Sequence, residues 1–313
     1  MDAARVQRFA ANRDRLAALA YRLLGSATDA EDVVQDAFLR WHAADRERIE
    51  VPEAWLTKVV TNLALDRLRS AMARRERAAG DWLPEPLLDG DPMLGPADSV
   101  EQRESVTLAV LILMERLTPA ERAVYVLREA FAYRHAEIAE ILDITEAASQ
   151  QHAHRARRRI GAERVGRQVD HAAARRVVEA FVAAASSGRT ERLVALLTDD
   201  VTAISDGAGV GSGHKLLRHA DPQRIVAALR AAFKPTPAKR RLVGGCPSMY
   251  AALVNGSPAI VAAVADRPVG VVVLQVRDDR IAAVCGIAAQ SRLGRLTERW
   301  RQREHDDPVI ESW

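Results

Sequence analysis

The side chains best suited to chemistry lie between residues 143 and 160. Asp143-Ile144 separates two helical stretches, and Asp is one of the few non-glycine types that tolerate the left-handed conformation of a tight turn. Thr145 can cap the second helix. This is helix-turn-helix spacing, and its second helix would carry side chains able to meet base edges and phosphates in a major groove. The candidates are Glu146, Ser149, Gln150, His154, Arg155, Arg157 and Arg158.

The helix before this turn must pack against its neighbours to hold the pair in place. Its apolar pattern predicts one buried stripe, formed by Ala136, Ile138, Ala139 and Leu142. An ordinary amphipathic helix pair has the same spacing and would present only a solvated basic face. Taken alone, these residues therefore support DNA binding and a purely structural role equally.

A second polar set lies on a predicted helix from Trp55 to Arg69. Trp55, Val59 and Leu63 recur at four-residue steps and are expected in the core. The remaining polar positions could meet unpaired bases and phosphates. They are Lys58, Asn62, Arg67 and Arg69.

A third set lies on a helix predicted to begin at a capping box, Thr28-Asp29-Ala30-Glu31, and to run to about Trp41. Val33, Ala37 and Trp41 share one apolar stripe, which leaves a mixed acidic and apolar face suited to protein docking. The candidate docking residues are Asp32, Gln35, Asp36, Phe38 and Leu39. A solvated acidic helix is the competing interpretation.

These helices together resemble the extracytoplasmic-function sigma factors of RNA polymerase. Residues 29–40 resemble the region-two helix that docks on the polymerase β′ clamp, and residues 55–69 resemble the helix that melts and reads the minus-10 element. Residues 117–122 followed by 154–159 resemble region four, which reads the minus-35 element and contacts the β flap. The resemblance implies core RNA polymerase and promoter DNA as partners. Where relatives carry Lys and Arg early in the recognition helix, this chain has Gln150, Gln151 and His152.

The pattern changes after residue 168 to two helices, 172–185 and 191–197, and then to short strands. Runs 248–254, 259–265, 269–276 and 281–287 predict an antiparallel sheet with helices on one face, an α+β domain. Asn255-Gly256 favours a type I′ hairpin, and Asp278-Asp279 predicts another turn.

Several short motifs in this half resemble a sigma-factor subgroup with a fused SnoaL-like domain, a conical fold of the nuclear-transport-factor-two type. They are Trp82-Leu83-Pro84-Glu85-Pro86-Leu87, Ser205-Asp206-Gly207-Ala208-Gly209 and Asn255-Gly256-Ser257-Pro258-Ala259, with Ala289-Gln290-Ser291-Arg292-Leu293 as a degraded fourth motif. The resemblance implies that this domain packs on the sigma domains or linker and tunes polymerase binding. The residues expected to make interdomain contacts are Trp82, Leu83, Pro84, Glu85, Pro86, Asp206, Gly207 and Asn255. Ordinary turn and linker chemistry is the alternative, although an undocked Trp82 would expose apolar surface.

The organisation expected from these patterns has five parts. They are region two at 1–75, a linker at 76–104, region four at 105–164, the SnoaL-like domain at 168–295 and a charged tail at 296–313 that either docks or frays. With 48% hydrophobic and 28% charged residues and a net charge of +3, the chain is globular, and local basic patches must carry any nucleic-acid binding.

A few residues bear on whether the chain is a metalloprotein, a disulfide-stabilised protein, an enzyme or a membrane protein. Cys246 and Cys285 lie far apart with no CxxC pair, so we expect neither a metal nor a disulfide framework. Asp206, His214 and His219 show no spacing for an acid-base pair, and no catalytic residue or cofactor is predicted. A small-molecule-sensing or catalytic SnoaL-like domain coupled to DNA binding remains the alternative function. With no signal peptide and no apolar run of membrane-spanning length, we expect a cytoplasmic protein without membrane contacts.

Overall fold

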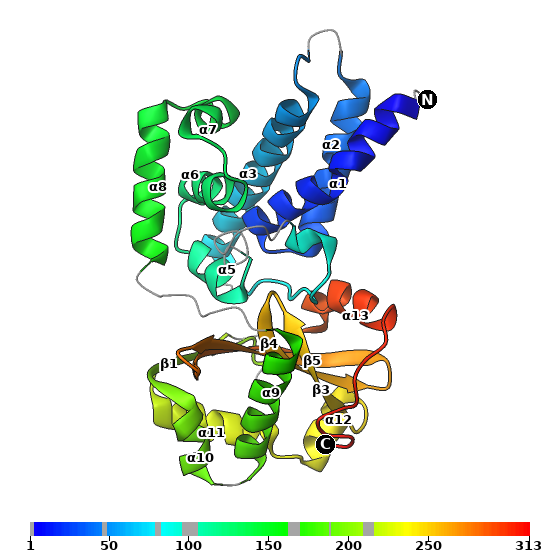
Figure 1. Ribbon diagram of the computed structural model, residues 1–313, viewed down its shortest axis with the longest axis vertical. Coiled ribbons are helices and arrows are strands. Elements are labelled where there is room, and N and C mark those ends of the chain that lie inside the picture. Colours follow the sequence, from blue (N-terminus) through cyan, green and yellow to red (C-terminus); the bar gives the residue numbers. More distant parts are fainter. Residues whose placement is uncertain are drawn as a thin grey trace. The chain divides into compact units, whose positions relative to one another are not determined.

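The computed structural model describes residues 3–45, 49–78, 83–95, 106–161, 170–187, 189–208 and 216–313. The chain divides into two compact units (Figure 1). The helical unit comprises residues 1–79, 90–106 and 110–163, and the second unit comprises 80–89, 107–109 and 164–313. The expected linker is thus divided between the units, because residues 83–89 belong to the second and residues 90–95 to the first.

The described chain up to residue 161 forms helices almost throughout. These are α1 (Ala3–Leu24), α2 (Ala27–Ala43), α3 (Pro52–Ala78), the 3₁₀ turn η2 (Pro92–Leu94), α5 (Leu108–Met114), α6 (Pro119–Tyr125), the π-helical turn η3 (Val126–Ala130), α7 (His135–Leu142) and α8 (Glu146–Ile160).

Helix α2 buries the predicted stripe but begins earlier than expected. Val33, Ala37 and Trp41 are buried as predicted. The predicted cap at Thr28 is wrong: Ser26 is the N-cap, and its side chain accepts a hydrogen bond from the backbone N–H of Asp29 at 3.1 Å. Ser26 lies two residues before the predicted cap. Because its hydroxyl accepts this hydrogen bond, the helix begins earlier, at Ala27.

The buried stripe of α3 is displaced by one residue from the prediction. Trp55, Val59 and Leu63 are only half-buried, and Trp55 packs beside Trp41 with ring centroids 5.7 Å apart. The fully buried positions are Leu56, Val60, Ala64, Leu65 and Leu68. Two apolar stripes run side by side on this helix, and four-residue spacing alone does not distinguish them.

The helix-turn-helix forms with its predicted turn and caps but with a narrower buried stripe. Asp143 adopts the left-handed conformation, with φ 53° and ψ 48°, and the Thr145 side chain caps α8. The predicted stripe is partly wrong, because Ala136 is exposed and the buried side chains are Ile138 and Ile141. Ile138 and Ile141 lie three residues apart on one face of α7, and Ala139 and Leu142 are half-buried beside them.

The second unit contains a six-stranded sheet covered by helices. Its elements are α9 (His171–Ser186), α10 (Thr190–Leu196), β1 (Leu197–Ser205), β2 (Leu217–His219), α11 (Pro222–Phe233), α12 (Pro237–Val243), β3 (Ser248–Val254), β4 (Ser257–Val264), β5 (Arg267–Arg277), β6 (Arg280–Ile287), η5 (Gln290–Arg292) and α13 (Gly294–Arg301).

The sheet is mixed, whereas the sequence predicted an antiparallel one. Its strand order is β2-β1-β6-β5-β4-β3, and β1 pairs with β6 in parallel. The four predicted strands β3 to β6 are antiparallel neighbours joined by tight turns. Both predicted turns have positive φ at their two central residues, at 255–256 and 278–279, which is the type I′ geometry that favours hairpins.

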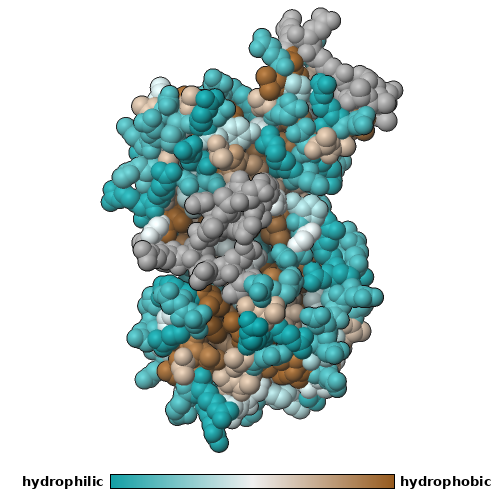
Figure 2. Space-filling model, in the orientation of Figure 1, coloured by the Kyte–Doolittle hydropathy of each residue, from teal (hydrophilic) through white to brown (hydrophobic). Residues whose placement is uncertain are grey.

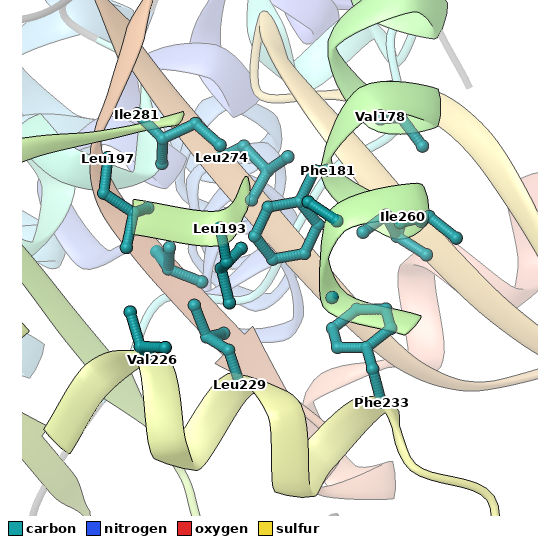
Figure 3. Close-up of a cluster of buried hydrophobic side chains, with 14 of the residues drawn as sticks. Val178, Phe181, Leu193, Leu197, Val226, Leu229, Phe233, Ile260, Leu274 and Ile281 are labelled. Carbon is teal, nitrogen blue, oxygen red and sulfur yellow. The ribbon is translucent and has the colours of Figure 1, made fainter. Parts of the chain in front are cut away.

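The core of this unit lies between the sheet and the helices α9, α10 and α11. Phe181 of α9 and Phe233 of α11 meet edge to face with ring centroids 5.4 Å apart. Figure 3 shows these rings pointing toward Leu193, Leu274 and the other apolar side chains of the cluster. The apolar faces of three helices and the sheet therefore share one hydrophobic core.

The charged tail docks on its own domain. Met249 of β3 exchanges backbone hydrogen bonds with Val309 and Ile310, and Trp313 is 8% exposed within the core cluster. Trp300 of α13 is also buried and stacks on His305 with ring centroids 3.5 Å apart. Of the two expected alternatives for the tail, the docked one is therefore found.

Candidate nucleic-acid and protein interfaces

Helix α8 presents a continuous exposed stripe at four-residue spacing. Glu146, Gln150, His154 and Arg158 are all exposed and follow one another along one face of the helix. The N-cap at Thr145 and the left-handed turn at Asp143 fix the direction in which the helix leaves α7. The stripe combines amide, imidazole and guanidinium groups, which can reach base edges and phosphates.

Ser149, the remaining candidate near the start of α8, faces inward. It is 0% exposed, and its hydroxyl lies 2.9 Å from Nδ1 of His135 in α7. A side chain buried in the joint between the two helices cannot touch DNA, so its assignment to a base contact is wrong. Ser149 instead bonds the two helices of the motif to each other.

Two of the candidate arginines of α8 are engaged within the helical unit. Arg157 donates to Glu129 at 2.6 Å, and Arg155 donates to Glu121 at 3.0 Å. Their side chains remain 54% and 45% exposed, respectively. They can contact phosphate only through the exposed part of each guanidinium, and their first role is to hold α8 on α6 and η3.

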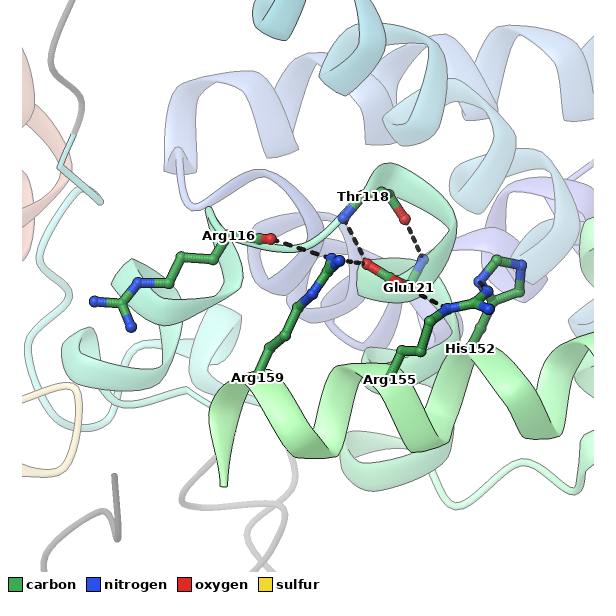
Figure 4. Close-up of polar contacts among 6 residues, drawn as sticks. All are labelled: Arg116, Thr118, Glu121, His152, Arg155 and Arg159. Carbon is green, nitrogen blue, oxygen red and sulfur yellow. Dashed lines mark hydrogen bonds and ion pairs between the residues drawn. The ribbon is translucent and has the colours of Figure 1, made fainter. Parts of the chain in front are cut away.

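Glu121 is the centre of this polar cluster (Figure 4). The carboxylate accepts the backbone N–H of Thr118 at 3.0 Å, completing the predicted capping box, and it also pairs with Arg155 and Arg159. Burial raises the pKa of Glu121, but the hydrogen bonds with Thr118, the charge of Arg159 and the hydrogen bond from Arg155 outweigh it and hold the pKa below its ordinary value. The cluster therefore contains a buried carboxylate that is fully ionised at neutral pH.

The polar face of α3 contacts the helix-turn-helix within the same unit. Lys58 Nζ donates to the carbonyl of Glu140 at 2.9 Å and to Asp143 Oδ1 at 3.2 Å. One residue earlier, the Thr57 hydroxyl lies 3.1 Å from the hydroxyl of Tyr133. The sequence did not reveal these contacts, because each joins residues more than 70 positions apart.

The other candidates on α3 differ in their surroundings. Arg67 donates to Asp29 Oδ1 at 3.3 Å and to Asp32 Oδ2 at 3.1 Å, so it is bound to the neighbouring helix α2. Arg69 pairs with Asp66 of its own helix at 3.1 Å and is exposed. Asn62 is half-buried on the same helix as these residues.

The candidate docking face of α2 combines acidic and apolar groups. Asp32, Gln35 and Asp36 are exposed, and Leu39 is 59% exposed. Phe38 is half-buried, because its ring packs edge to face on Phe9 at 5.1 Å. Figure 2 shows a mainly hydrophilic surface on the visible face of the helical unit.

The residues after the Trp82 position dock on the second unit. Leu83, Pro84, Glu85 and Pro86 are buried. Leu87 exchanges two hydrogen bonds with Asn255, each of 2.9 Å: its N–H donates to the Asn255 side-chain oxygen, and its carbonyl accepts from the Asn255 N–H. Trp82 itself lies outside the described residues, so its expected docking is not described.

A second anchor of the linker comes from the degraded motif. A guanidinium nitrogen of Arg292, the last residue of η5, donates to the carbonyl of Leu83. Asp89, at the other end of the segment, lies 3.3 Å from His171, and its carbonyl accepts from Arg303 at 3.2 Å. Residues 83–89 are thus held by four side chains, those of His171, Asn255, Arg292 and Arg303. The sequence suggested Asn255 and the motif that contains Arg292.

Asp206 is a structural anchor inside the second unit. Its carboxylate accepts the backbone N–H groups of Ala208, Ala288 and Ala289 at 2.8–3.1 Å, while Gly207 follows it with positive φ. Burial, followed by the charge of Asp206, raises the pKa of the Cys285 thiol to about 12, so that thiol is unreactive. His214, the possible partner of Asp206 in acid-base chemistry, lies outside the described residues.

The second unit also contains a cavity of about 220 Å³. It is lined by residues of all six strands and of α11, and His219 is one of them. Among the residues that the structure describes, no group of three His, Cys, Asp or Glu side chains could hold a metal ion. None of the described helices is both long and apolar enough to cross a membrane.

Two family models match the helical part of the chain. Residues 8–74 match sigma-70 region 2, and residues 107–160 match sigma-70 region 4. The ECF RNA polymerase sigma factor SigJ of Mycobacterium tuberculosis is 43% identical over 205 residues, 65% of this chain and 65% of that protein. This match thus spans slightly less than two thirds of SigJ. The probable ECF RNA polymerase sigma factor SigI of the same species is 37% identical over 238 residues, 72% of this chain and 80% of that protein.

The similarity to a solved structure extends through both units. The crystal structure of the Mycobacterium tuberculosis extracytoplasmic function sigma factor SigJ aligns with a TM-score of 0.69 and 31% sequence identity. The alignment covers 92% of this chain and 98% of that one, so it includes the sheet-containing domain.

Proposed function

Since this chain belongs to the extracytoplasmic function (ECF) sigma factors, proteins of transcription initiation, we propose that its surfaces bind core RNA polymerase and the two promoter elements as follows. The expected fold class, two helical sigma domains followed by an α+β SnoaL-like domain, is confirmed. The chain's relatives are sigma factors, and we assign it no catalysis. It would act where the polymerase is, in the cytoplasm.

The observation that carries the proposal is the exposed stripe of α8 behind the left-handed turn at Asp143. Gln150, His154 and Arg158 are exposed on one side of α8, and the opposite side is buried. This arrangement suits the helix for insertion into a major groove. Arg158 would bind phosphate, whereas Gln150 and His154 would meet base edges of the minus-35 element. Glu146 would disfavour close phosphates at one end of the stripe.

The α2 surface would dock on the polymerase β′ clamp. Leu39 supplies an exposed apolar anchor, and Asp32, Gln35 and Asp36 surround it with groups for polar contacts. Such an anchor within a polar rim is typical of protein interfaces. Region four would in turn contact the β flap, placing the two helical regions on separate sites of the same enzyme.

The polar face of α3 would read the minus-10 element, but not in the arrangement described here. Lys58 is bonded to Glu140 and Asp143, both in the helix-turn-helix. The same ammonium cannot bind the turn and a promoter phosphate at full strength. We infer that regions two and four separate when the protein joins polymerase and promoter, which frees Lys58 and leaves Asn62 and Arg69 beside it on α3.

The C-terminal domain would regulate the sigma domains through the linker. Its hairpin residue Asn255 and its Arg292 hold residues 83–89, the chain segment that leads to residues 90–95 of the helical unit. Docking shortens the free length of the linker and so restricts how far regions two and four can separate. This tether would let the domain tune polymerase binding.

Transcription with purified mycobacterial core polymerase tests the proposal. A fragmented genomic library serves as template, and sequencing of the RNA 5′ ends identifies the promoters. The full chain is compared with a version that ends at Arg164 and with one that lacks residues 296–313. We expect initiation at a shared promoter motif, changed in level by truncation. If no form directs initiation, the proposal fails; if truncation changes nothing, the regulatory role fails.

A pair of matched variants tests the docking face. Leu39→Asp should reduce binding to core polymerase at least tenfold, because it places a charge at the centre of the interface. Val51→Asp is the control, since Val51 is 56% exposed in the same unit but outside the α2 face. Equal effects of the two substitutions would refute the assignment of this face.

A further inference from the structure

The cavity in the second unit is walled almost entirely by hydrocarbon. It holds about 220 Å³ and is lined by Phe233 of α11, Met249 of β3, Ile260 of β4 and equivalent side chains of the other strands. The pocket is partly open to solvent, so its apolar walls face water, and an apolar ligand that covers them removes that surface from water. In another protein, an apolar cavity of about 150 Å³ is already large enough to take up benzene.

The lining determines which kind of molecule could fill this space. No Asp, Glu, Lys or Arg is among the described residues that line it, and His219 is the one titratable side chain there. The Ser205 hydroxyl, also in the wall, already accepts the backbone N–H of Gly207 at 3.2 Å. Lys239 lies over the ring of Trp313, with Nζ 5.2 Å from its centroid, but this ammonium already donates to three backbone carbonyls. A bound ion would lose its hydration without gaining a counter-charge from the lining residues, so the cavity favours a neutral molecule. The volume is below the usual range for drug-sized ligands, which favours a molecule of one or two rings.

One wall of the cavity belongs to the docked tail. Trp313 lines it, and the indole N–H of this residue donates to the carbonyl of Phe233 at 2.8 Å. The backbone N–H of Trp313 donates to Pro247, and its carbonyl accepts from Arg240 Nε at 3.1 Å. Earlier in the tail, residues 309 and 310 form backbone hydrogen bonds with Met249, itself a lining residue. Cavity wall and tail attachment therefore share the same residues.

We propose that this cavity binds a small, uncharged, mainly apolar molecule of one or two rings, and that Trp313 forms a removable wall against which the molecule packs. His219 is placed to meet a single polar atom of the ligand. Because the occupant contacts Trp313, binding holds residues 309–313 on the domain more firmly. This inference concerns a site separate from the polymerase and promoter surfaces, and its test needs neither partner.

Binding is measured by ¹⁹F NMR on the full chain at pH 8 with two probes, 1-fluoronaphthalene and 4-fluoro-1-naphthoate. They share a ring system, and the second adds a carboxylate. We expect fluoronaphthalene to bind and the naphthoate to bind at least tenfold more weakly. Equal affinity for the two probes, or no binding of fluoronaphthalene, would overturn the proposal.

Two variants locate the probe. Ala262→Leu adds three carbons to the cavity wall on β4, and Trp313→Ala removes the tail's wall; each should weaken fluoronaphthalene binding at least fivefold. Ala283→Leu is the control, since Ala283 lies half-buried on β6 of the same sheet but outside the lining. Circular dichroism identifies any variant that fails to fold, and Ala262→Leu keeps the test decisive if Trp313→Ala, which removes a side chain of the core cluster, does not fold. Unchanged binding in both folded variants would place the probe elsewhere and refute the site.

Hydrogen exchange gives a second readout on the unmodified protein. The backbone N–H groups of Val309, Ile310 and Trp313 are bonded to Met249 and Pro247. Saturating fluoronaphthalene should slow their exchange severalfold, because opening of the tail would expose the ligand to water. Unaltered exchange in these three amides, with the probe bound, would show that Trp313 is not part of its wall.

Discussion

Lys58 Nζ lies 3.2 Å from Asp143 Oδ1, so a helix expected to read one promoter element is paired with the turn of the motif expected to read the other. Both side chains are substantially exposed, at 40% and 83%. Such a pair contributes at most about 1 kcal/mol. It can bias the closed arrangement of regions two and four without locking it, which is what a protein that must open on its partner requires.

Removing this pair should favour the open arrangement. Asp143→Asn keeps a residue type that tolerates the left-handed conformation but deletes the charge. We expect the open population to rise by up to about fivefold. Dyes at Glu31→Cys and Gln151→Cys, in a chain whose exposed Cys246 is replaced by Ser, report the separation by energy transfer. Raising the salt concentration should act in the same direction. Asp66→Asn, which affects a pair inside α3 alone, should leave the separation unchanged; an equal shift there would refute the interpretation.

The buried carboxylate of Glu121 should make region four sensitive to acid. Its folded pKa is lowered, so its contribution to stability is present above its unfolded pKa of about 4.3 and is lost as the pH falls through the folded pKa. Glu121→Gln should reduce the free energy of unfolding by about 2 kcal/mol at pH 7. Urea unfolding should show this difference shrinking below about pH 4. Glu140→Gln, at an exposed position on α7, is the control; a difference that persists in acid would contradict the assignment.

The Asn255 side chain should hold the linker on the hairpin. Asn255→Gly removes the acceptor of the Leu87 N–H while retaining the positive φ of 50° that the turn requires. Loss of this buried acceptor should cost about 1–3 kcal/mol. Hydrogen exchange at Leu87 and Asp89 should accelerate accordingly.

The other hairpin supplies the matched control for Asn255. Asp278 has the same φ of 50° in a turn of the same type but lies in the β5–β6 connection. Asp278→Gly should leave the exchange of Leu87 and Asp89 unchanged. If both glycine variants release the linker, the effect comes from turn flexibility and the proposed anchor is wrong.

Two residues of the exposed stripe of α8 should contribute to different properties: Arg158 to the overall affinity for DNA and Gln150 to its sequence specificity. Arg158→Ala should weaken binding to every duplex about equally and reduce the salt dependence by about one released ion. Gln150→Ala should instead reduce discrimination at one base position, by about 1–3 kcal/mol. Fluorescence anisotropy with the promoter duplex at several salt concentrations separates the two effects. Arg224→Ala, an exposed arginine of the second unit, should change neither. If Gln150→Ala weakens binding to every duplex equally, Gln150 does not read a base.

Local chemistry explains which elements the sequence predicted well. The Thr118 capping box, the left-handed turn at Asp143 and the hairpins at Asn255 and Asp278 depend on residues within four positions of one another, and the structure contains each of them. Strands β3 to β6 were predicted for the same reason, since tight turns join them in sequence order.

Long-range pairing explains what the sequence did not predict. Ser149 was taken for a base contact because nothing in the local pattern shows that His135 would meet it. The parallel pairing of β1 with β6 joins residues about 80 positions apart, such as Ile204 and Cys285, and no turn connects these two strands. Likewise, the burial of Trp313 depends on a sheet edge that the tail sequence cannot reveal.

The pairing of β1 with β6 also sets an order for folding during synthesis. Strand β1 lacks its parallel neighbour until residue 287 has left the ribosome, and the linker cannot bond to Asn255 until the β3–β4 hairpin exists. The helices before residue 161 depend on nearer contacts and can form first. Newly made chains would therefore pass through a period in which the sigma regions are folded and the linker is untethered, and a ribosome that pauses within the last strands would lengthen that period.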